Sequence, residues 1–471
     1  MRNPDRGKTM NETVAQAVTT HSGRLVEFLL SLTAENVPAA VICEARIRLL
    51  DTLGCGLYGS MMPWSRIAAE VIGEERSQGH ATIYGSREAA APARAALVNG
   101  TATHGIELDD IAPGHCHPGT AVVPAVLAVA EQFGLSGMRV LLGMVAGYEA
   151  TSRTGRGIGE VGWGFHLPAI AGTVGAAVGS GVALGMPHEQ VMRALGIACS
   201  SAAGIRSFVQ GSGGMVKRLH AGRAAEAGVL ACLLARRGFT APLAALDGKF
   251  GLLEVFGGEN CKPQALDADL GERFVISKVW TKMYPFCGGI HTMAQALQAL
   301  RTQHSIAPSD VKSVRVGVNH RAMALHTEAA PREMMAAQYS MPFVAATALA
   351  GDPRDPRSFM AEALDDTVVC SLARRVELYL DADMDAIYPR HGAHVEICMA
   401  GGQKLSATLL AAKGTPEDPC NEEEVKEKFR CLAAAAVTDE AIAEIMSLVG
   451  RIETLSTVTS LSTLLRAGMR S

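Results

Sequence analysis

Residues 105–120 bring together side chains that could transfer protons or bind a metal ion. The segment reads GIELDDIAPGHCHPGT, in a protein of which only 19% is charged. Histidines and carboxylates are good ligands for transition metals, and a histidine beside a carboxylate also suits general acid–base catalysis. An ordinary polar turn is the third interpretation. The side chains concerned are Glu107, Asp109, Asp110, His115, Cys116 and His117.

The spacing of these residues favours acid–base chemistry over metal binding. None of the usual zinc-ligand spacings occurs, and alternate side chains from 115 to 117 would point in different directions on an extended chain. Pro113-Gly114 and Pro118-Gly119 are expected to break helical structure where the histidines occur. We therefore expect a loop without a metal, in which Asp109 or Asp110 orients His117. Taken alone, the segment is equally compatible with a polar turn.

Two further segments place basic side chains at the start of predicted helices. In GWGFHLPAIAG (162–172), His166 precedes a proline and a helix of small residues, whose N-terminus favours an anion. The segment GSGGMVKRLHAG (211–222) is a glycine-rich loop that matches neither of the common glycine-rich phosphate motifs, so nucleotide binding is not indicated. The basic residues of this loop are Lys217, Arg218 and His220.

A fourth segment, KMYPFCGGIHTMAQAL (282–297), carries Lys282 and His291 near the junction of two predicted domains. Crevices between domains are common ligand sites. A single histidine is more often structural than catalytic, but several polar segments broken by Gly and Pro around one crevice change that expectation. We predict that one cavity at this junction holds the side chains of His117, His166, Lys217 and His291.

The hydrophobic periodicity divides the chain into a large helical domain and a smaller α+β domain. We expect a flexible tail over 1–23, a helical domain over 24–272, an α+β domain over 273–416, and C-terminal helices over 417–471 that complete the helical domain. The fold class is therefore mainly α, with the α+β domain inserted before the C-terminal helices. The helical segments expected are 39–59, 94–108, 122–133, 140–155 and 221–238.

Local patterns predict individual elements of the last two segments. Valines alternate at 314, 316 and 318, and apolar residues alternate at 376, 378 and 380, which indicates strands. Residues 394–409 read as a hairpin that turns at Gly401-Gly402. Thr438 is expected to be the N-cap of a C-terminal helix.

Composition excludes several classes of protein. The net charge of −4 does not indicate a nucleic-acid partner, and eleven cysteines without a CxxC pair argue against a zinc ribbon or a disulfide framework. The N-terminal residues contain no apolar stretch typical of a signal peptide. The most apolar segment, 169–185, is too short and too rich in small residues for a membrane span, so we expect a buried helix. We therefore expect a cytoplasmic protein that binds no membrane.

Taken together, these segments resemble the MmgE/PrpD family, which includes 2-methylcitrate dehydratase, cis-aconitate decarboxylase and iminodisuccinate epimerase. The resemblance covers nearly the whole chain after about residue 24. It rests on the order and spacing of several motifs. They are NGTATHGIELDD followed by HPG, GYE at 147–149, GFHLPAIAGTVGAA, GGMVKRLHAGRAAEAG, and the K-x-YP-x5-H pattern from Lys282 to His291.

The resemblance implies a homodimer in which the α+β domain acts as a lid, and it implies a set of active-site residues. The active site of cis-aconitate decarboxylase matches this chain at His117, His166, Lys217 and His291. Three other positions depart from that enzyme. Its DFDDT motif begins here with Glu107 and ends with Ile111, and a lid tyrosine is replaced by Phe343. Such changes alter hydrogen bonding and pocket volume, which weakens the assignment to that enzyme itself.

The implied chemistry is removal of a proton next to a carboxylate of a small di- or tricarboxylate, without a cofactor or metal. We expect Lys217 and Lys282 to bind substrate carboxylates, with Arg218 assisting. His166 and His291 are the expected base and acid, and His117 could exchange a proton or hold a carboxylate. Glu107, Asp109 and Asp110 are expected to line the substrate site.

A hydro-lyase similar to 2-methylcitrate dehydratase is the favoured activity. The alternatives are an epimerase or racemase of an iminodisuccinate-like substrate and a decarboxylase of the cis-aconitate type. A catalytically silent protein that binds polycarboxylates is the alternative outside enzymology.

Overall fold

The computed structural model describes residues 19–159, 164–210 and 214–468, which divide into two compact units. The helical unit comprises residues 19–105, 109–279 and 422–468, and the α+β unit comprises residues 106–108 and 280–421. Each unit has its own hydrophobic core. The fold class expected from the sequence, mainly α with a smaller α+β part, is therefore confirmed.

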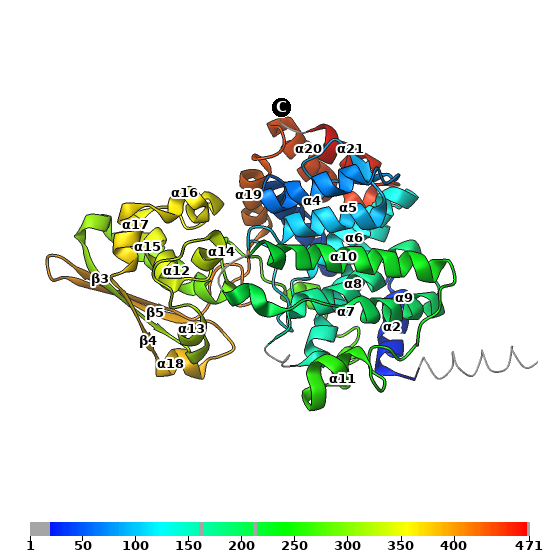
Figure 1. Ribbon diagram of the computed structural model, residues 1–471, viewed down its shortest axis with the longest axis horizontal. Helices are drawn as coiled ribbons and strands as arrows, with labels where there is room; N and C mark the ends of the chain where they lie inside the picture. The colour runs from blue at the N-terminus through cyan, green and yellow to red at the C-terminus, as the bar shows by residue number, and fades with distance from the viewer. Residues whose placement is uncertain (1–18, 160–163, 211–213, 469–471) are drawn as a thin grey trace, which may run out of the picture. The chain divides into compact units, whose positions relative to one another are not determined.

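Long helices form the core of the helical unit, and glycines allow some of them to approach closely. Helices α7 (Gly137–Ile158), α8 (Leu167–Leu184) and α10 (Met215–Arg236) lie side by side (Figure 1). A Cβ atom at Gly175 of α8 would overlap Thr151 Oγ1, and one at Gly143 of α7 would lie 2.8 Å from Gly179 O. Larger residues at these positions would push the helices apart.

The remaining elements of the helical unit surround these three helices. The longer helices are α2 (His21–Ser31), α3 (Ala39–Ser60), α4 (Pro63–Glu74), α5 (Pro92–Thr103), α6 (Pro118–Phe133), α9 (His188–Ser201), α19 (Glu422–Ala433), α20 (Asp439–Gly450) and α21 (Thr459–Ala467). The short elements are β1 (Ala81–Thr82), β2 (Ala89–Ala90), α11 (Leu252–Gly257) and the 3-10 helices η1 (Arg206–Gln210), η2 (Gly258–Asn260), η3 (Pro263–Leu266), η4 (Val275–Lys278) and η8 (Ile452–Thr454).

The predicted helices are present, and two of them differ in their bounds next to the polar loop. The helix predicted over 94–108 ends at Thr103, because His104 and Gly105 take up a turn that caps it. The helix predicted over 122–133 begins at Pro118, since proline fits the first turn of a helix, where its missing N–H is no loss. The prediction that Pro118-Gly119 breaks helical structure was therefore wrong, because this dipeptide begins α6.

Among the described residues, one helix has the length and hydropathy of a membrane span. It is α8, and 89% of its apolar window is buried inside the structure. The burial confirms the expectation of a core helix for residues 169–185. Its small residues meet those of α7, as described above.

The C-terminal helices pack in the helical unit. Thr438 caps α20, as predicted, and accepts a hydrogen bond from Ala441 N. On α19, the Lys428 ammonium lies 2.6 Å from Asp51 of α3, and both side chains are buried. Loss of one partner of a buried ion pair leaves an unpaired buried charge, which destabilises the fold. The pair therefore holds α19 against α3.

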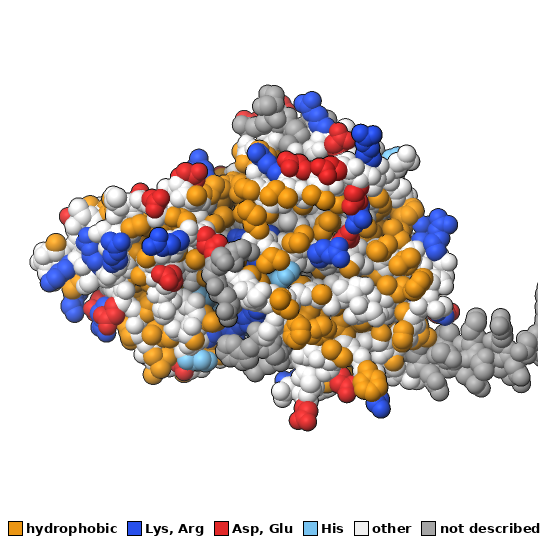
Figure 2. All heavy atoms as spheres, in the orientation of Figure 1, with side chains coloured by type: hydrophobic (Ala, Val, Ile, Leu, Met, Phe, Trp, Pro, Cys, Tyr) orange, Lys and Arg blue, Asp and Glu red, His pale blue; other side chains and the backbone are white. Residues whose placement is uncertain are grey.

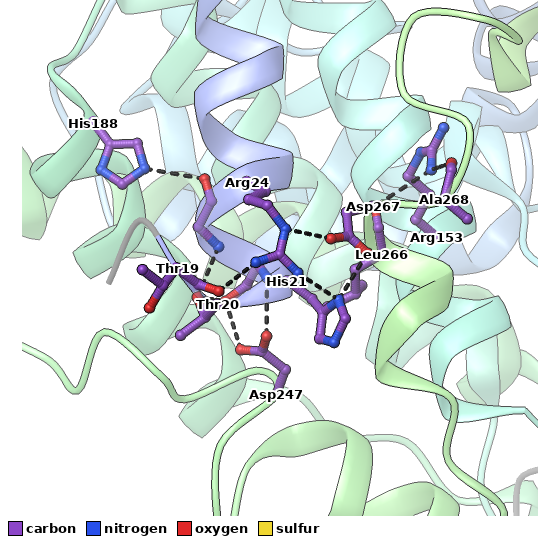
Figure 3. A network of polar contacts seen from close by, with 12 residues as sticks. Thr19, Thr20, His21, Arg24, Arg153, His188, Asp247, Leu266, Asp267 and Ala268 are labelled. Carbon is purple, nitrogen blue, oxygen red and sulfur yellow. Dashed lines mark hydrogen bonds and ion pairs between the residues drawn. The ribbon is translucent and has the colours of Figure 1, made fainter. Parts of the chain in front are cut away.

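The first described helix, α2, is held by ionic contacts at its N-terminus. Ser22 donates hydrogen bonds from its backbone N and its Oγ to Asp247, and His21 and Arg24 both contact Asp267 (Figure 3). A carboxylate at a helix N-terminus is favoured by the helix dipole. Residues 19–23, predicted to belong to a flexible tail, therefore include the start of an anchored helix, and residues 1–18 lie outside the described part.

A four-stranded mixed sheet organises the α+β unit. The strand order is β4 (Val376–Leu380), β3 (Val311–Val318), β5 (Ala393–Met399), β6 (Lys404–Leu409), with β3 and β4 parallel and the other pairs antiparallel. The turn between β5 and β6 includes Gly402 with φ 87°, so the predicted hairpin is confirmed. The predicted strands at 314–318 and 376–380 are also present.

Helices cover this sheet. The longer ones, α12 (His291–His304) and α15 (Met341–Ala350), pack beside the strands (Figure 1). The others are α13 (His320–Leu325), α14 (Met334–Gln338), α16 (Ala361–Leu364), α17 (Thr367–Ala373) and α18 (Ala382–Ala386), with the 3-10 helices η5 (Gly288–Ile290), η6 (Pro308–Asp310) and η7 (Pro356–Phe359).

The chain passes between the units at 279/280 and 421/422, and for the short stretch 106–108. The sequence had suggested changes at 272/273 and 416/417. The difference at the first position arises because Val275, Ile276 and Val279 are buried in the helical core although their spacing is not that of a long helix.

Candidate active site

Four helix ends bring four histidines together in the helical unit. His104 follows the last turn of α5, His117 and His166 precede the first turns of α6 and α8, and His220 lies near the start of α10. The ring centroids are separated by 5.3 Å from His117 to His104, 5.9 Å from His104 to His166, and 5.1 Å from His166 to His220. The imidazoles therefore form a continuous row.

The carboxylate of Asp109 ends this row. Its Oδ2 lies 2.7 Å from His117 Nδ1 and 3.2 Å from His104 Nδ1. Burial alone would raise the pKa of Asp109, but the charges of His104 and His117 and their hydrogen bonds outweigh burial and hold that pKa well below its ordinary value. Asp109 is therefore an anion at neutral pH. Of the two carboxylates considered from the sequence, it is Asp109 that contacts His117.

His117 is the member of this group that solvent can reach. Its side chain is 17% exposed, whereas those of His104 and Asp109 are each 1% exposed. Nδ1 is the ring nitrogen of His117 beside Asp109, and the carboxylate favours the tautomer with its proton on that nitrogen. The Nε2 atom is then the position at which His117 can exchange a proton with a bound molecule.

The same three residues are also the group that could hold a metal ion. One ligand atom each from His104, Asp109 and His117 lies within 4.8 Å of the others. In a tetrahedral zinc site the ligand atoms are about 3.3 Å apart, as follows from bonds of about 2.0–2.1 Å. The 2.7 Å between Asp109 Oδ2 and His117 Nδ1 is shorter than this separation.

At the other end of the row, His166 and His220 are held neutral. Their Nδ1 atoms are 3.0 Å apart, so one donates to the other. Burial lowers the pKa of His166 well below its ordinary value, and the positive charge of Lys217 and the other histidines lower it further. Burial, His104 and Lys217 lower the pKa of His220 to about 4. A neutral imidazole can accept a proton, so His166 has the protonation state of a base.

Lys217 supplies positive charge beside these neutral histidines. It lies in the first turn of α10 and is 2% exposed. The two imidazoles beside Lys217 are neutral, so its buried ammonium is the positive charge at this end of the row. Such an ammonium is suited to bind an anion. The glycine-rich residues 211–213, predicted to form the loop that delivers Lys217, lie outside the described residues.

Arg218 is engaged by the protein itself. Its guanidinium lies over the Trp64 ring, 4.9 Å from the centroid, and donates to Gly105 O at 3.3 Å and Gly214 O at 2.6 Å. These contacts fix the end of the turn that follows α5. Its predicted assistance in substrate binding stays a prediction.

A second carboxylate, Asp110, holds the polar loop in place. Tyr148 of α7 donates a 2.7 Å hydrogen bond to Asp110 Oδ2, and Gly119 N in the first turn of α6 donates to Oδ1 at 3.0 Å. Burial raises the pKa of Asp110 to about 6, although the Tyr148 hydrogen bond lowers it and the neighbouring Asp109 raises it. Because Asp110 binds the helix that His117 begins, it has a positioning role.

The other two polar residues of the loop, His115 and Cys116, belong to a tight turn. Ala112 and Cys116 form an isolated bridge, which makes the intervening residues a tight turn with positive φ at Gly114 and His115. His115 is exposed, and Cys116 is buried, with burial raising the pKa of its thiol to about 12.

The α+β unit contains the other predicted residues. Lys282 Nζ lies 3.7 Å from Glu107 Oε2, and both side chains are buried. Glu107 has φ 58°, a strained conformation for a residue other than glycine, and such strain is frequent at functional sites. The two predicted substrate-binding residues are therefore brought together as an ion pair.

His291 begins α12 and is held by the segment before it. Its Nε2 lies 3.2 Å from Phe286 O, so Nε2 carries a proton. Its ring makes T-shaped contacts with the rings of Tyr284 and Phe286. Phe343, at the position of the lid tyrosine in the resemblance, is 1% exposed and packs against Phe359 in the core of this unit.

Sequence reasoning missed His104 and gave His220 no role. The helix predicted to continue to residue 108 would have placed His104 on a helix surface, one turn away from the loop. A usable pattern was present, because His104 and Gly105 follow the apolar run of α5 and glycine often marks a helix end.

Comparison with known families adds an independent finding. A family model described as the MmgE/PrpD N-terminal domain matches residues 23–264, and one described as the MmgE/PrpD C-terminal domain matches residues 284–451. The first match covers most of the helical unit and the stretch 106–108, and the second covers most of the α+β unit and helices α19 and α20.

Several curated proteins are similar over nearly the full length. The chain is 28% identical to an Aspergillus oryzae protein named cis-aconitate decarboxylase-like protein oryM, over 94% of this chain and 97% of that one. It is 27% identical to cis-aconitate decarboxylase of Aspergillus terreus, over 94% and 95% of the two chains. The human cis-aconitate decarboxylase is 25% identical, over 90% of each chain.

Replacing Asp110 by asparagine should change how stability depends on pH. The pKa of Asp110 is raised from its ordinary value of 3.8 to about 6, so the folded state binds this proton more tightly than the unfolded chain does. The stabilisation this gives is complete below about pH 4 and is lost as the pH rises through about 6. Asp110→Asn cannot ionise. We expect the melting midpoint of the parent, relative to Asp110→Asn, to fall between pH 4 and 6.5 and then stay level.

Tyr148→Phe is the matched control for this experiment. It removes the hydrogen bond that lowers the Asp110 pKa, so the fall should move to higher pH. A difference between parent and Asp110→Asn that is the same at every pH would contradict the raised pKa of Asp110.

Proposed function

Because the chain belongs to the MmgE/PrpD family, we propose that it is a lyase that acts on a small polycarboxylate by moving a proton next to a carboxylate. The names of the similar proteins support the lyase class, since they are cis-aconitate decarboxylases or resemble them. The observation that carries the proposal is the row of histidines, which is anionic at its Asp109 end and positively charged near Lys217.

In this proposal His117 is the acid. Its Nδ1 lies 2.7 Å from Asp109 Oδ2, which leaves Nε2 as the nitrogen that can face the substrate. His117 Nε2 then gives its proton to the departing group or to the carbanion. Asp109 holds the ring in the orientation that this transfer requires.

His166 is the proposed base, and Lys217 binds a carboxylate of the substrate. His166 by itself is a weak base, because burial and Lys217 lower its pKa. A bound polycarboxylate brings negative charge to Lys217 and removes part of that effect. Substrate binding therefore raises the basicity of His166 at the moment when it must take a proton from carbon.

The presence of both an acid and a base favours a hydro-lyase. Elimination of water needs a base for the carbon-bound proton and an acid for the departing hydroxyl, whereas decarboxylation needs only an acid that protonates the carbanion after carbon dioxide leaves. The neutral His166 and the Asp109-supported His117 supply both groups. Decarboxylation is the second candidate, since the names of the similar proteins favour it.

We further propose that Lys282 and His291 act on the same substrate. Lys282 is paired with Glu107, which precedes Asp109 by two residues in the chain. In this proposal a substrate carboxylate competes with Glu107 for Lys282. His291, with Nε2 protonated in its present contact, can donate a hydrogen bond to a second carboxylate.

Proton NMR in heavy water tests this function. Purified protein is incubated separately with 2-methylcitrate, citrate, cis-aconitate and the stereoisomers of iminodisuccinate. We expect loss of water from 2-methylcitrate or citrate and deuterium at a carbon next to a carboxylate. His117→Asn and Lys217→Met should each reduce turnover by at least about 100-fold, as is typical for acid–base groups and for charge stabilisation.

The chain offers controls for both variants. His115→Asn changes an exposed histidine of the same loop, and Arg223→Met changes an exposed cation of the same helix as Lys217, so both should keep parental activity. Release of carbon dioxide from cis-aconitate without dehydration would select the decarboxylase. Binding of these acids with neither turnover nor deuterium exchange would leave a binding protein and overturn the proposal.

We also propose that the chain forms a homodimer through an apolar surface of the helical unit. Ile67 and Val71 of α4 are 52% and 54% exposed, and Met215, Val216 and Leu219 at the start of the adjacent α10 are also exposed. Figure 2 shows hydrophobic side chains gathered over this face of the unit. Contiguous apolar surface of this kind is typical of protein interfaces.

Replacing Ile67 and Val71 together by lysine should give a monomer. Light scattering during gel filtration should show about twice the 49.4 kDa chain mass for the parent and the chain mass for the variant. Val368→Lys, at a position of α17 that is 48% exposed, is the control and should stay dimeric. A parent that elutes as a monomer at micromolar concentration would overturn the homodimer.

A further inference from the structure

A cysteine and a histidine that the proposed reaction does not use form a close pair in the α+β unit. Cys287 lies directly before η5, and His326 lies directly after α13. Cys287 Sγ is 3.7 Å from His326 Nε2, within reach of a sulfur hydrogen bond. Cys287 is partly exposed.

The protein backbone fixes the proton positions of the pair. His326 Nδ1 lies 2.8 Å from Tyr339 O, and because a carbonyl only accepts, Nδ1 carries a proton. Nε2 is therefore the atom that can take the thiol proton. On the other side, Cys287 N donates to Gln338 O at 3.0 Å, and Gln338 Nε2 donates to Pro285 O at 2.7 Å, which holds the segment before the cysteine.

The charges around the pair favour the thiolate. Burial would raise the pKa of Cys287, but the charge and hydrogen bond of His326, the Gly289 N–H and the charge of Lys282 outweigh it and lower the pKa to about 7. Burial lowers the pKa of His326, whereas Cys287 and the Tyr339 carbonyl raise it and the charge of Arg321 opposes them, with a net rise.

Four cysteines of the helical unit have thiols whose pKa is shifted in the opposite direction. Burial raises the pKa of the thiols of Cys116 and Cys232 to about 12, and it also raises those of Cys55 and Cys199. Cys55, Cys116 and Cys232 are buried in the helical unit, and Cys199 is partly exposed. The pairing with His326 therefore separates Cys287 from them.

We propose that Cys287 is a nucleophilic cysteine that adds covalently to soft electrophiles of the α,β-unsaturated carbonyl class. Sγ forms a bond to the β-carbon of the electrophile, and the electron pair of the double bond moves to the α-carbon. The proton that His326 Nε2 took from the thiol is then returned to this α-carbon. The product is a thioether, and no oxidant or other reactant is needed.

Competitive labelling with N-ethylmaleimide tests the proposal. The full chain is treated with less than one equivalent of reagent at pH 6, and the labelled cysteines are identified by peptide mass spectrometry. Cys431, which is exposed, is the internal reference. A thiol of pKa about 7 has about 30-fold more thiolate at pH 6 than one of pKa 8.5, and its lower intrinsic nucleophilicity costs about fivefold, so Cys287 should react about sixfold faster.

The variant His326→Gln should remove this advantage, and the rate at Cys287 should then rise with a midpoint above pH 8. His320→Gln is the matched control, since His320 lies at the start of the same helix α13, is 61% exposed and contacts Asp385. The control should label as the parent does.

The pH profile of the parent tests the proposal without a variant, so its result does not depend on whether a variant folds. Its rate of labelling at Cys287 should have a midpoint near pH 7. A midpoint above pH 8 in the parent, faster labelling of Cys431 at pH 6, or an unchanged rate in a folded His326→Gln would each overturn the proposal. None of these readouts depends on the lyase activity, so they fail or succeed independently of the proposed function.

Discussion

The buried carboxylate of Asp109 is the constraint on which the candidate site depends. A buried anion is strongly unfavourable unless opposite charges or hydrogen-bond donors surround it, and here the rings of His104 and His117 lie against the carboxylate. The carboxylate in turn orients the two rings that lie against it. The end of α5 and the beginning of α6 are thereby held in one arrangement, with His117 Nε2 as the exchangeable position.

Further contacts within the helical unit stabilise this arrangement. Glycines bring α7 and α8 close enough for their ends to meet the polar loop, and Tyr148 of α7 reaches Asp110 beside it. Asp110 in turn binds the first turn of α6, so the position of His117 rests on a second buried carboxylate. Since N-termini of α6, α8 and α10 carry His117, His166 and Lys217, partial positive charge from three helices adds to the attraction for an anion.

The sequence was informative about the elements and about part of the site. Periodicity identified the small-residue helix α8, the hairpin β5–β6 and the cap at Thr438, because each depends on local patterns. The position of His166 before α8 followed from the proline after it. The partners of Asp109 could not be predicted, since His104 becomes its neighbour only when α5 ends at Thr103. Likewise, Cys287 and His326 are far apart in the chain, and no local sequence pattern predicts that they pair.

The protonation of His117 tests the central claim most directly. Nitrogen NMR of protein with 15N-labelled histidine distinguishes a proton on Nδ1 from one on Nε2. The account predicts that the neutral ring of His117 keeps its proton on Nδ1, facing Asp109, and that Asp109→Asn weakens this preference. A neutral His117 with its proton on Nε2 in the parent, unchanged by Asp109→Asn, would show that Asp109 does not orient the ring and would contradict the account.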